Sequence, residues 1–456
     1  ISTQSARNLS TTTKTIPQMT AITPRWLHKI LPWVQVESGT YRVNRTKIVL
    51  KEGVHVPIDS EGNISQQGLS AIPMFSALEG DVIEQMTAQL ESEQVGRESV
   101  LMVQGEDRDK LFIITGGKVE VLQSGDYGEQ LSLGVLSVGS YFGDAALVAN
   151  APSACTVRAL TDCQFLTLNK AHLDAILDES PERREYFNQA IEDRMNLRAS
   201  ANEHGEQAIG MESGHEGEPD LPETFIDYVD EPIEYPLSVV QSIIRVHTRV
   251  SDLYNNPINQ LEQQLRLTVE GMKEKQEWEI INNPGFGLLH AADSTMRVHT
   301  RYGPPTPDDM DELLSRVWKQ PAFFLAHPSA IAAFGRECTR RGVPPATIQM
   351  FGSPFLTWRG VPIIPSNKLM VSGNGAGRTN ILLMRVGEKE QGVVGLHQPG
   401  LPGEVSPSLS VRMMNVNQKA VASYLLTLYF SCAVQTVDAL AVLENVEVGY
   451  YHDYTS

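Results

Sequence analysis

The chain has 456 residues, enough for two or three domains with buried cores. Its 55 acidic residues outnumber 37 basic ones, giving a formal charge of -18, and no basic cluster is visible, so nucleic-acid binding is disfavoured because it depends on neutralising phosphates. Four widely spaced cysteines without a Cys-x-x-Cys pair argue against a zinc site or a disulfide framework, and favour a reducing cytoplasm.

The N-terminal part is rich in Ser and Thr up to Thr23 and lacks the apolar core of a signal peptide. It contains one apolar knot, WLHKILPW, over residues 26–33. This knot has no obvious place in a core of its own chain, so we expect it to clamp a neighbouring copy. Residues 41–50 then alternate and are rich in β-branched side chains, which predicts an extended strand.

Short strands punctuated by glycine are predicted between residues 70 and 198, the pattern that a β-jelly-roll needs. Residues 171–198 carry apolar residues at helical spacing, and Pro181 separates this stretch into two helices. We expect these helices to close the domain. With a short helical entry at residues 73–78 and a strand, turn and strand at residues 111–121, this segment resembles a cyclic-nucleotide-binding domain.

The stretch FGDAALVANAPSACT, residues 142–156, resembles the phosphate-binding cassette of that family. In this cassette, backbone N–H groups at the start of a short helix face the anion. The resemblance assigns the phosphate and ribose contacts of a cyclic-nucleotide-like pocket to seven positions: Gly143, Asp144, Ala145, Ala146, Ser153, Ala154 and Thr156.

Two of these positions depart from the family. Ser153 stands where the family has the arginine that grips the phosphate, and Asp144 stands where it has a longer glutamate. Losing one charged partner of a desolvated phosphate costs about 2 to 5 kcal/mol. We therefore expect no cofactor, and weak or no binding of cyclic AMP or another cyclic nucleotide. The alternative is a jelly-roll kept as a structural or protein-contact module.

An acidic flexible linker is predicted after the jelly-roll, because no lysine or arginine occurs between residues 199 and 244 and glutamates accumulate among glycines. Residues 225–229 then predict an extended return strand. A two-stranded arm interrupted at its tip by a whole domain accounts for both strands, since insertions are tolerated at exposed loop tips.

The C-terminal half predicts a helix beside a sheet. Asn256-Pro257 predicts the capped start of a long helix that stops at residues 282–285. Its apolar residues fall on one face: Ile258, Leu261, Leu265, Val269 and Met272. Residues 421–434 predict one strand buried on both faces. The apolar stretch that contains this strand is too short to span a bilayer, so we expect no membrane partner.

Candidate catalytic groups have simpler structural explanations. We expect first-turn capping for the carboxylates that follow Thr306-Pro307, namely Asp308, Asp309, Asp311 and Glu312. The glycine-rich residues 373–377 precede a strand-like stretch at residues 379–386 rather than a helix, which favours a hairpin turn over a phosphate loop.

No catalytic or metal site is predicted. Neither a G-x-S-x-G elbow nor a Cys-His pairing is visible. The histidines considered as metal ligands are too scattered to form a cluster: His247, His290, His299 and His327. The lack of any such catalytic or metal-binding motif in the sequence favours a structural protein over an enzyme.

Three passages of the C-terminal half resemble the shell protein of family 2 encapsulins: residues 278–293, 304–314 and 323–342. Residues 351–369, FGSPFLTWRGVPIIPSNKL, resemble tailed-phage capsid proteins of the Hong Kong 97 type. A cyclic-nucleotide-like domain inserted in the extended arm is similar to subfamily 2B in particular. The resemblance implies an α+β, Hong Kong 97-type phage capsid-like protomer with an inserted β-jelly-roll cyclic-nucleotide-binding-like domain.

The resemblance also implies a division of the chain. It predicts an N-terminal arm (1–40), the outgoing strand of an extended arm or E-loop (41–69), the inserted domain (70–198), the acidic linker (199–222), the return strand of the E-loop (223–240), a P-domain with its spine helix (241–325), an A-domain (326–419), and a P-domain strand with the C-terminus (420–456).

The function implied by this resemblance is that of a structural shell protein rather than an enzyme. Copies of the chain are expected to form an icosahedral nanocompartment in the bacterial cytoplasm, a T=1 shell of about 60 copies, with neither nucleic acid nor membrane as partner. The implied cargo is an enzyme of isoprenoid or terpene metabolism, similar to 2-methylisoborneol synthase or a polyprenyl diphosphate synthase. The alternatives are a cyclic-nucleotide-regulated enzyme and a small-oligomer signalling adaptor.

Overall fold

The computed structural model describes residues 19–37, 39–48, 55–59, 62–76, 78–106, 109–125, 130–144, 152–202, 205–212, 222–253, 255, 259–373 and 377–452. The chain divides into two compact units. The main unit combines Ile1–Val43 with Ile233–Ser456, and the inserted unit is Asn44–Pro232. The inserted unit therefore interrupts the main unit along the sequence, which agrees with the predicted insertion of one domain into another.

The first sheet of the main unit is organised around the long strand β22 (Val421–Val434), which has the predicted bounds. It pairs with β12 along residues 421–430, with β21 along 422–428 and with β19 along 431–434. The other strands are β1 (Trp33–Gln35), β12 (Ser238–His247), β19 (Val393–His397), β20 (Glu404–Ser406) and β21 (Leu409–Val416).

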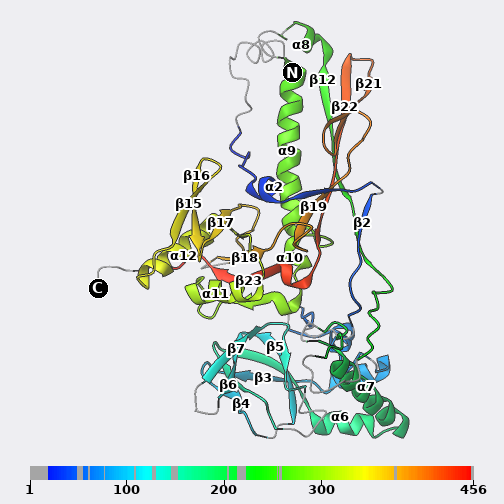
Figure 1. Ribbon diagram of the computed structural model, residues 1–456, viewed down its shortest axis with the longest axis vertical. Coiled ribbons are helices and arrows are strands. Elements are labelled where there is room, and N and C mark those ends of the chain that lie inside the picture. The colour runs from blue at the N-terminus through cyan, green and yellow to red at the C-terminus, as the bar shows by residue number, and fades with distance from the viewer. Residues whose placement is uncertain are drawn as a thin grey trace. The chain divides into compact units, whose positions relative to one another are not determined.

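The long helix α9 (Gln260–Asn282) runs beside β12 and β22 (Figure 1). Its N-cap is Asn259, whose side chain accepts a hydrogen bond from the backbone N–H of Glu262 at 3.0 Å. The predicted cap at Asn256-Pro257 is therefore wrong; residues 256–258 lie outside the described part of the chain. The predicted apolar face is confirmed by the four members that pack against the core of this sheet: Leu261, Leu265, Val269 and Met272.

The second sheet of the main unit has seven strands. In spatial order they are β13 (Arg297–His299), β23 (Leu440–Glu447), β18 (Arg378–Met384), β14 (Phe323–Ala326), β17 (Val361–Pro365), β16 (Ser353–Trp358) and β15 (Ala346–Met350). Helices α11 (Pro307–Arg316) and α12 (Pro328–Arg340) contribute Met310 and Phe334 to the core on this sheet. The short helices of the unit are α8 (Thr248–Leu253), α10 (Leu288–Ala291), η1 (Ser294–Met296) and η2 (Val437–Ala439).

The N-terminal apolar knot forms α2 (Trp26–Ile30) and β1, and it packs into the main unit's own core. Leu27 is fully buried, the Trp26 ring contacts that of Phe355 edge to face at 5.2 Å, and β1 pairs in parallel with β19. At Gly395 of β19, a Cβ atom would lie 2.7 Å from the Trp33 ring, so only glycine fits beneath this indole. The expectation that the knot has no place in its own core is therefore wrong.

The predicted two-stranded arm begins in the main unit, where β2 (Thr40–Val43) pairs antiparallel with β11 (Ile233–Pro236). The return strand predicted at residues 225–229 is not a strand: in the inserted unit this stretch makes an isolated bridge, between Thr46 and Tyr228. Pro232 separates the two pairings, and proline cannot donate to a ladder.

The inserted unit contains a jelly-roll of two four-stranded sheets, drawn in cyan and blue-green in Figure 1. One sheet is β3 (Glu91–Val95), β10 (Cys163–Asn169), β5 (Lys110–Gly116) and β8 (Tyr141–Phe142); the other is β4 (Val100–Met102), β9 (Thr156–Ala159), β6 (Lys118–Ser124) and β7 (Gln130–Ser137). Gly117 joins β5 to β6 at φ +88°, where a Cβ atom would lie 2.4 Å from the carbonyl oxygen of Asp162, so the turn requires glycine.

A second core of the inserted unit joins the jelly-roll to its helices. These are α3 (Gln66–Ser70), α4 (Gly80–Ala88), α6 (Lys170–Leu177) and α7 (Pro181–Ser200), the last two close to the predicted closing helices. The predicted helical entry at residues 73–78 is instead a pair of turns, in which Phe75 N–H donates to Ile72 and Leu78 N–H to Phe75. Among the helices that the structure describes in either unit, none is both long and apolar enough to cross a bilayer.

Candidate functional site

Gly143 and Asp144 begin the cassette directly after β8. Gly143 has φ +86°, and a Cβ atom there would lie 2.4 Å from the carbonyl oxygen of Lys110, so the position needs glycine. Asp144 follows with an exposed side chain. Ala145 and Ala146 lie outside the described residues, as does the rest of the chain up to residue 151.

The second half of the cassette is tied to the loop after β4. The backbone of Ser153 exchanges two hydrogen bonds with this loop, donating to Glu106 at 3.0 Å and accepting from Gly105 at 2.8 Å. The Ser153 hydroxyl donates to the carbonyl oxygen of Cys155 at 3.2 Å, and the Thr156 hydroxyl accepts from the backbone N–H of Gln104 at 3.0 Å. Ala154 lies between them, exposed. Both hydroxyls thus help to fix the loop itself.

The described part of the cassette carries negative rather than positive charge. Burial raises the pKa of the Cys155 thiol, and the Asp144 carboxylate raises it further. One residue from each half of the cassette therefore lies near the other. Two cations of the jelly-roll are already paired: Arg158 with Glu120 at 3.1 Å and Lys110 with Glu93 at 3.5 Å. Among the described residues of the cassette, 142–144 and 152–156, Gly143 makes a turn that only glycine fits, and no position carries a guanidinium.

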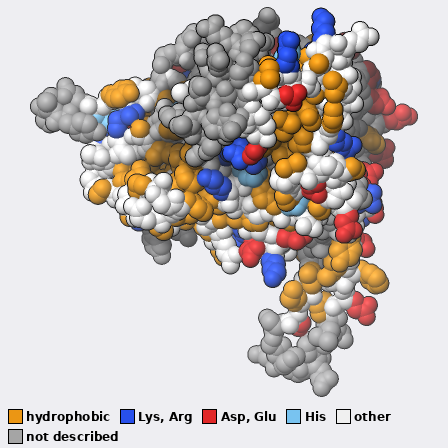
Figure 2. Space-filling view, turned by 90° about the horizontal axis from the view of Figure 1, so that it is seen from above, with side chains coloured by type: hydrophobic (Ala, Val, Ile, Leu, Met, Phe, Trp, Pro, Cys, Tyr) orange, Lys and Arg blue, Asp and Glu red, His pale blue; other side chains and the backbone are white. Residues whose placement is uncertain are grey.

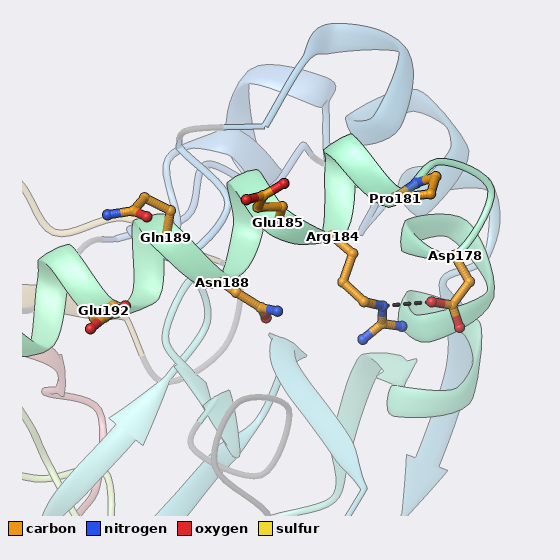
Figure 3. Close-up of a pocket in the computed structure, with 7 residues that line it drawn as sticks. All are labelled: Asp178, Pro181, Arg184, Glu185, Asn188, Gln189 and Glu192. Carbon is orange, nitrogen blue, oxygen red and sulfur yellow. Dashed lines mark hydrogen bonds and ion pairs between the residues drawn. The ribbon is translucent and has the colours of Figure 1, made fainter.

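A shallow depression lies on α7 and the turn before it (Figure 3). Its lining is polar and consists of Asp178, Pro181, Arg184, Glu185, Asn188, Gln189 and Glu192. The Arg184 guanidinium donates to Asp178 at 2.6 Å and to Asp174 at 3.0 Å. Because two carboxylates neutralise this arginine and the other lining side chains are charged or amide groups apart from Pro181, the depression has the character of a solvated helix face.

The carboxylates of α11 have structural partners. Thr306 and Asp309 form a reciprocal capping box, with Thr306 N–H donating to Asp309 at 2.9 Å and Asp309 N–H donating to the Thr306 hydroxyl at 3.3 Å. Asp311 accepts from the indole N–H of Trp358 at 2.7 Å, and Glu312 pairs with Arg301 at 2.9 Å. Asp308 lies 3.5 Å from Arg341. The predicted capping role is confirmed for Asp309, and Asp311 and Glu312 bind other elements.

The remaining motifs give no cluster of reactive groups. His299 is buried beside Glu444, His327 caps α12 by accepting from Ser329 N–H at 3.1 Å, and His290 and His247 belong to α10 and the end of β12. Within the described ranges, no three His, Cys, Asp or Glu side chains lie close enough to hold a metal ion. Ser372 and Arg378 exchange backbone hydrogen bonds across the glycine-rich stretch, of which residues 374–376 lie outside the description.

The inserted unit carries an exposed aromatic strap, formed by residues 45–48, 205–212 and 222–229. Its parts are held by hydrogen bonds: Lys47 N–H donates to Asp227, and the Gln207 side chain bridges Phe225 and Asp227. Phe225 is 88% exposed and Tyr228 68% exposed. The exposure of both aromatic side chains makes the strap a candidate contact surface.

The main unit exposes apolar side chains on the sheet around β12 and β21. The exposed members are Val239, Ile243, Met413, Met414 and Val416, with Leu253 of α8 nearby in sequence. In the view from above (Figure 2), hydrophobic side chains gather on the surface and are interspersed with both basic and acidic ones. In the ladder, Met413 and Val416 are in register with the buried Ile244 and Val246, whereas Val239 and Ile243 lie on the other side of the sheet. The second candidate contact surface is therefore the side of β12 that carries Val239 and Ile243.

Sequence reasoning missed a buried charge cluster beneath the N-terminal segment. Glu274 of α9 accepts hydrogen bonds from Thr23, 251 residues away in the chain, and from Arg25 and Lys368. The signal in the sequence is the spacing of Glu270, Glu274 and Glu277 along one helix face. Their burial could not be inferred, because it depends on a segment that packs over them from the other end of the chain.

Two family models match the chain. The model described as Type 2A encapsulin shell protein SrpI-like matches residues 194–450, and the cyclic nucleotide-binding domain model matches residues 92–180. The first covers more than half of the chain. The second falls within the inserted unit.

The similar proteins are encapsulin shell proteins. SrpI of Synechococcus elongatus is 64% identical over 237 residues, which are 52% of this chain and 76% of that relative, so the relative is the shorter protein. A Type 2A encapsulin shell protein of Mycobacterium leprae is 54% identical over 247 residues, 54% of this chain and 80% of the relative. The cryo-EM structure of the holo-SrpI encapsulin complex of Synechococcus elongatus aligns with a TM-score of 0.57 at 38% identity, over 99% of this chain and 98% of that one.

These similarities confirm the capsid-like α+β protomer with an inserted cyclic-nucleotide-binding domain. They also confirm a structural protein, since the relatives are described as shell proteins and not as enzymes. The prediction of subfamily 2B is wrong: the matching model and these relatives are described as Type 2A. The inserted domain alone had suggested 2B, and it does not decide the subfamily.

Proposed function

Because the chain belongs to the SrpI-like Type 2A encapsulin shell family, we propose that its copies close into an icosahedral shell that encloses a cargo enzyme. The expected partner of each chain is another copy of itself, in a T=1 arrangement of about 60 copies. The cytoplasm remains the expected compartment.

The observation that carries this proposal is the exposure of Phe225 and Tyr228 on the aromatic strap. Interfaces between subunits are enriched in such aromatic anchors, which become buried in the assembly. The strap carries four carboxylates, Glu206, Glu212, Glu223 and Asp227, against two cations, Arg45 and Lys47, whereas the exposed side of β12 carries Arg245 beside Ile243. Opposite charge on the two surfaces supports contact between the strap of one copy and the exposed side of β12 of another.

In the proposed shell, each part of the chain has the role expected from the division into arms and capsid domains. Residues 41–69 and 223–240 act as the two sides of an extended arm, with residues 199–222 as its linker. Residues 241–325 and 420–456 act as the P-domain and residues 326–419 as the A-domain. The antiparallel pairing of β2 with β11 supports the arm.

The inserted unit is proposed to bind cyclic nucleotides weakly or not at all. The support is the hydroxyl of Ser153 in place of a guanidinium and the carboxylate of Asp144 near Cys155. A contact or regulatory role of the domain is consistent with the fixed loop around Ser153.

The identity of the cargo stays a prediction. An isoprenoid or terpene enzyme was expected through subfamily 2B, so this expectation now needs its own test. Mass spectrometry of proteins that co-purify with native particles checks it: a prenyl-diphosphate-using enzyme inside the particles supports the prediction, and another enclosed class of enzyme contradicts it.

Negative-stain microscopy of strap variants tests the proposed assembly. The double substitution Phe225→Ser and Tyr228→Ser should leave folded protomers that do not close into particles, because both anchors are lost. The control is Tyr186→Ser on α7, which removes an exposed aromatic ring outside the strap and should leave the particles intact. Normal particles from the double variant would contradict the proposed role of the strap.

A further inference from the structure

The ladder of β2 and β11 depends on the rest of the main unit for its stability. It has four residue pairs, from Thr40 opposite Pro236 to Val43 opposite Ile233, and none of its residues is buried. A pair of strands without a covering layer is at best marginally stable in water. Contacts with the body of the main unit must therefore hold this ladder in place.

Two tyrosines supply such contacts. Tyr41 and Tyr235 are directly opposite each other in the ladder, so their side chains share one face of it. Both rings pack against a small apolar cluster of the main unit. The buried members of this cluster are Val36, Val394, Leu396 and Ala433. The face of the ladder that carries the tyrosines is therefore the one that packs against β19 and β22.

The hydroxyl groups of the two tyrosines bind the end of β22 and the residue that follows it. Tyr235 OH donates to the carbonyl oxygen of Val434 at 2.7 Å. Tyr41 OH accepts from the side-chain amide of Gln435 at 3.0 Å and donates to the Glu388 carboxylate at 3.1 Å. Val434 and Gln435 are both buried. Bonds from opposite strands of the ladder thus end on neighbouring residues of the core.

We propose that Tyr41 and Tyr235 are positioning residues of the extended arm: together they clasp the β2–β11 ladder to the main unit and set the direction in which the arm leaves it. The inference rests on the proposed role of this ladder as the base of the arm. Packing of the rings is non-directional, whereas hydrogen bonds hold only within narrow limits of distance and angle. The hydroxyl groups therefore determine the direction, and the rings supply the adhesion.

The other face of the ladder is held less firmly. Arg42 and Glu234 are opposite each other there and pair at 2.7 Å, with both side chains exposed. An exposed ion pair contributes little to stability, and this one joins the two strands to each other rather than to the core. The tyrosine face alone therefore decides whether the ladder stays on the main unit.

A fixed direction matters for a closed shell because its copies make the same contacts with their neighbours. An arm that swings would present its contact surface in a different place in each copy. Opening of the clasp should therefore lower the yield of closed particles, although each protomer stays folded.

Tyr41→Phe and Tyr235→Phe test the clasp, because phenylalanine keeps the ring on the apolar cluster and removes only the hydroxyl. Hydrogen exchange of the full-length protein is followed by mass spectrometry on peptides that contain residues 40–43 and 233–236. Exchange of these peptides should become about fivefold faster in each variant and about 25-fold faster in the double variant, since opening of the ladder breaks both sets of bonds. Fractions of equal particle mass are compared, so that assembly does not affect the result.

The acceleration should be confined to the ladder, with peptides from β22 still protected. Unchanged exchange of the ladder in the double variant would overturn the clasp. Equal acceleration in β22 would overturn it as well, because the tyrosines would then stabilise the core as a whole.

Matched controls separate the hydroxyl bonds from other changes in the ladder. Glu388→Gln keeps an acceptor for Tyr41 and should change exchange by less than about twofold, whereas Glu388→Ala should speed exchange and add little to Tyr41→Phe. Arg42→Ala removes only the exposed ion pair and should also stay within about twofold. An effect of Arg42→Ala as large as that of Tyr41→Phe would contradict the assignment.

Mass photometry of the same variants tests the link to assembly. The double variant should give fewer closed particles than the wild type. Normal particles together with faster exchange of the ladder would overturn the positioning role and leave the proposed shell intact. Conversely, a wild type that forms no particles, with faster exchange confined to the ladder in the double variant, would contradict the proposed shell and support the clasp.

Discussion

The buried Asp309 and the half-buried Asp438 differ in what surrounds them. Asp309 sits in a capping box, and Asp438 accepts hydrogen bonds from the buried Arg385 at 2.7 Å while pairing with Lys319 at the same distance. Burial alone would raise the pKa of Asp438, but Arg385, Lys319 and Thr436 outweigh it and hold the pKa well below its ordinary value. The two residues stabilise different elements: Asp309 starts a helix, and Asp438 fixes the turn before β23.

Asp438→Asn should destabilise the main unit by about 3 kcal/mol at pH 7, because it leaves Arg385 buried without its partner charge. The contribution of a carboxyl group with a lowered pKa is present above its ordinary value of 3.8 and is lost as the pH falls below it. The loss caused by the substitution should therefore shrink between pH 7 and pH 3 in urea-unfolding curves.

The control for Asp438→Asn is Glu262→Gln. It removes an exposed pair with Arg266 on α9 and should cost less than about 0.5 kcal/mol. Equal losses in the two variants would mean that the Asp438 pair contributes no more than a surface ion pair.

Restoring the missing charge of the cassette tests why cyclic nucleotides are expected to bind weakly. Ser153→Arg should strengthen binding of cyclic AMP by an amount on the order of 2 to 5 kcal/mol, provided that the backbone around Gly143 still fits the phosphate. Isothermal calorimetry on the full chain measures it, with Ser153→Gln as a polar control without charge.

Submicromolar binding by the wild type would contradict the expectation and place the counter-charge on another residue. Equal absence of binding in Ser153→Arg and the wild type would mean that the backbone around Gly143 does not admit the phosphate and that the domain serves another purpose.

The capping role of Asp309 could be predicted from the sequence, whereas the burial of Glu277 could not. A threonine, a proline and an acidic residue at fixed spacing define a capping box within four positions. Glu277 is surrounded by Arg25, Ser366 and Lys368 from distant parts of the chain, so local spacing contains no information about its burial.

At the scale of elements, the N-terminal segment behaves as part of the main core. Leu27 is fully buried and belongs to the same cluster as Ile280 and Phe430. Leu27→Ala should therefore destabilise the protomer by about 2 to 5 kcal/mol in thermal or chemical unfolding.

Lys29→Ala, an exposed change on the same helix, serves as the control for Leu27→Ala. A folded, fully stable protomer with alanine at position 27 would show that α2 is an arm that merely rests on the core. For the same reason, deletion of residues 1–35 is expected to destabilise the protomer itself, and not only its assembly.

Long periodic elements were predictable, whereas short paired ones were not. β22 and the apolar face of α9 follow from patterns that extend over a dozen residues or more. The strand at 225–229 was misplaced because the pairing of β11 with β2 depends on a partner more than 180 positions away, and short β-rich runs on both sides of Pro232 satisfy the same local pattern. The apolar knot was misjudged for a similar reason, since its place beside β19 cannot be inferred from its own residues.

At the scale of the whole molecule, the inserted unit enters and leaves the main unit between two paired residues. Val43 of β2 and Ile233 of β11 are opposite each other in the ladder. Replacing residues 44–232 with a short Asn-Gly turn should therefore close β2 and β11 into a hairpin and leave the main unit folded.

Particles should still form after this replacement if the inserted unit only modifies the shell. Negative-stain microscopy checks it, beside a control that keeps the strap by replacing residues 49–204 alone. Particles from the control but not from the hairpin variant would assign the essential contacts to the strap, and loss of particles from both would assign them to the jelly-roll.

The mass of the assembled particle tests the central claim most directly. Charge-detection mass spectrometry or mass photometry of the purified full-length protein should give closed particles of about 60 copies of the 50.4 kDa chain, on the order of 3 MDa. A stable monomer, dimer or other small oligomer under the same conditions would contradict the account of this chain as a self-assembling shell.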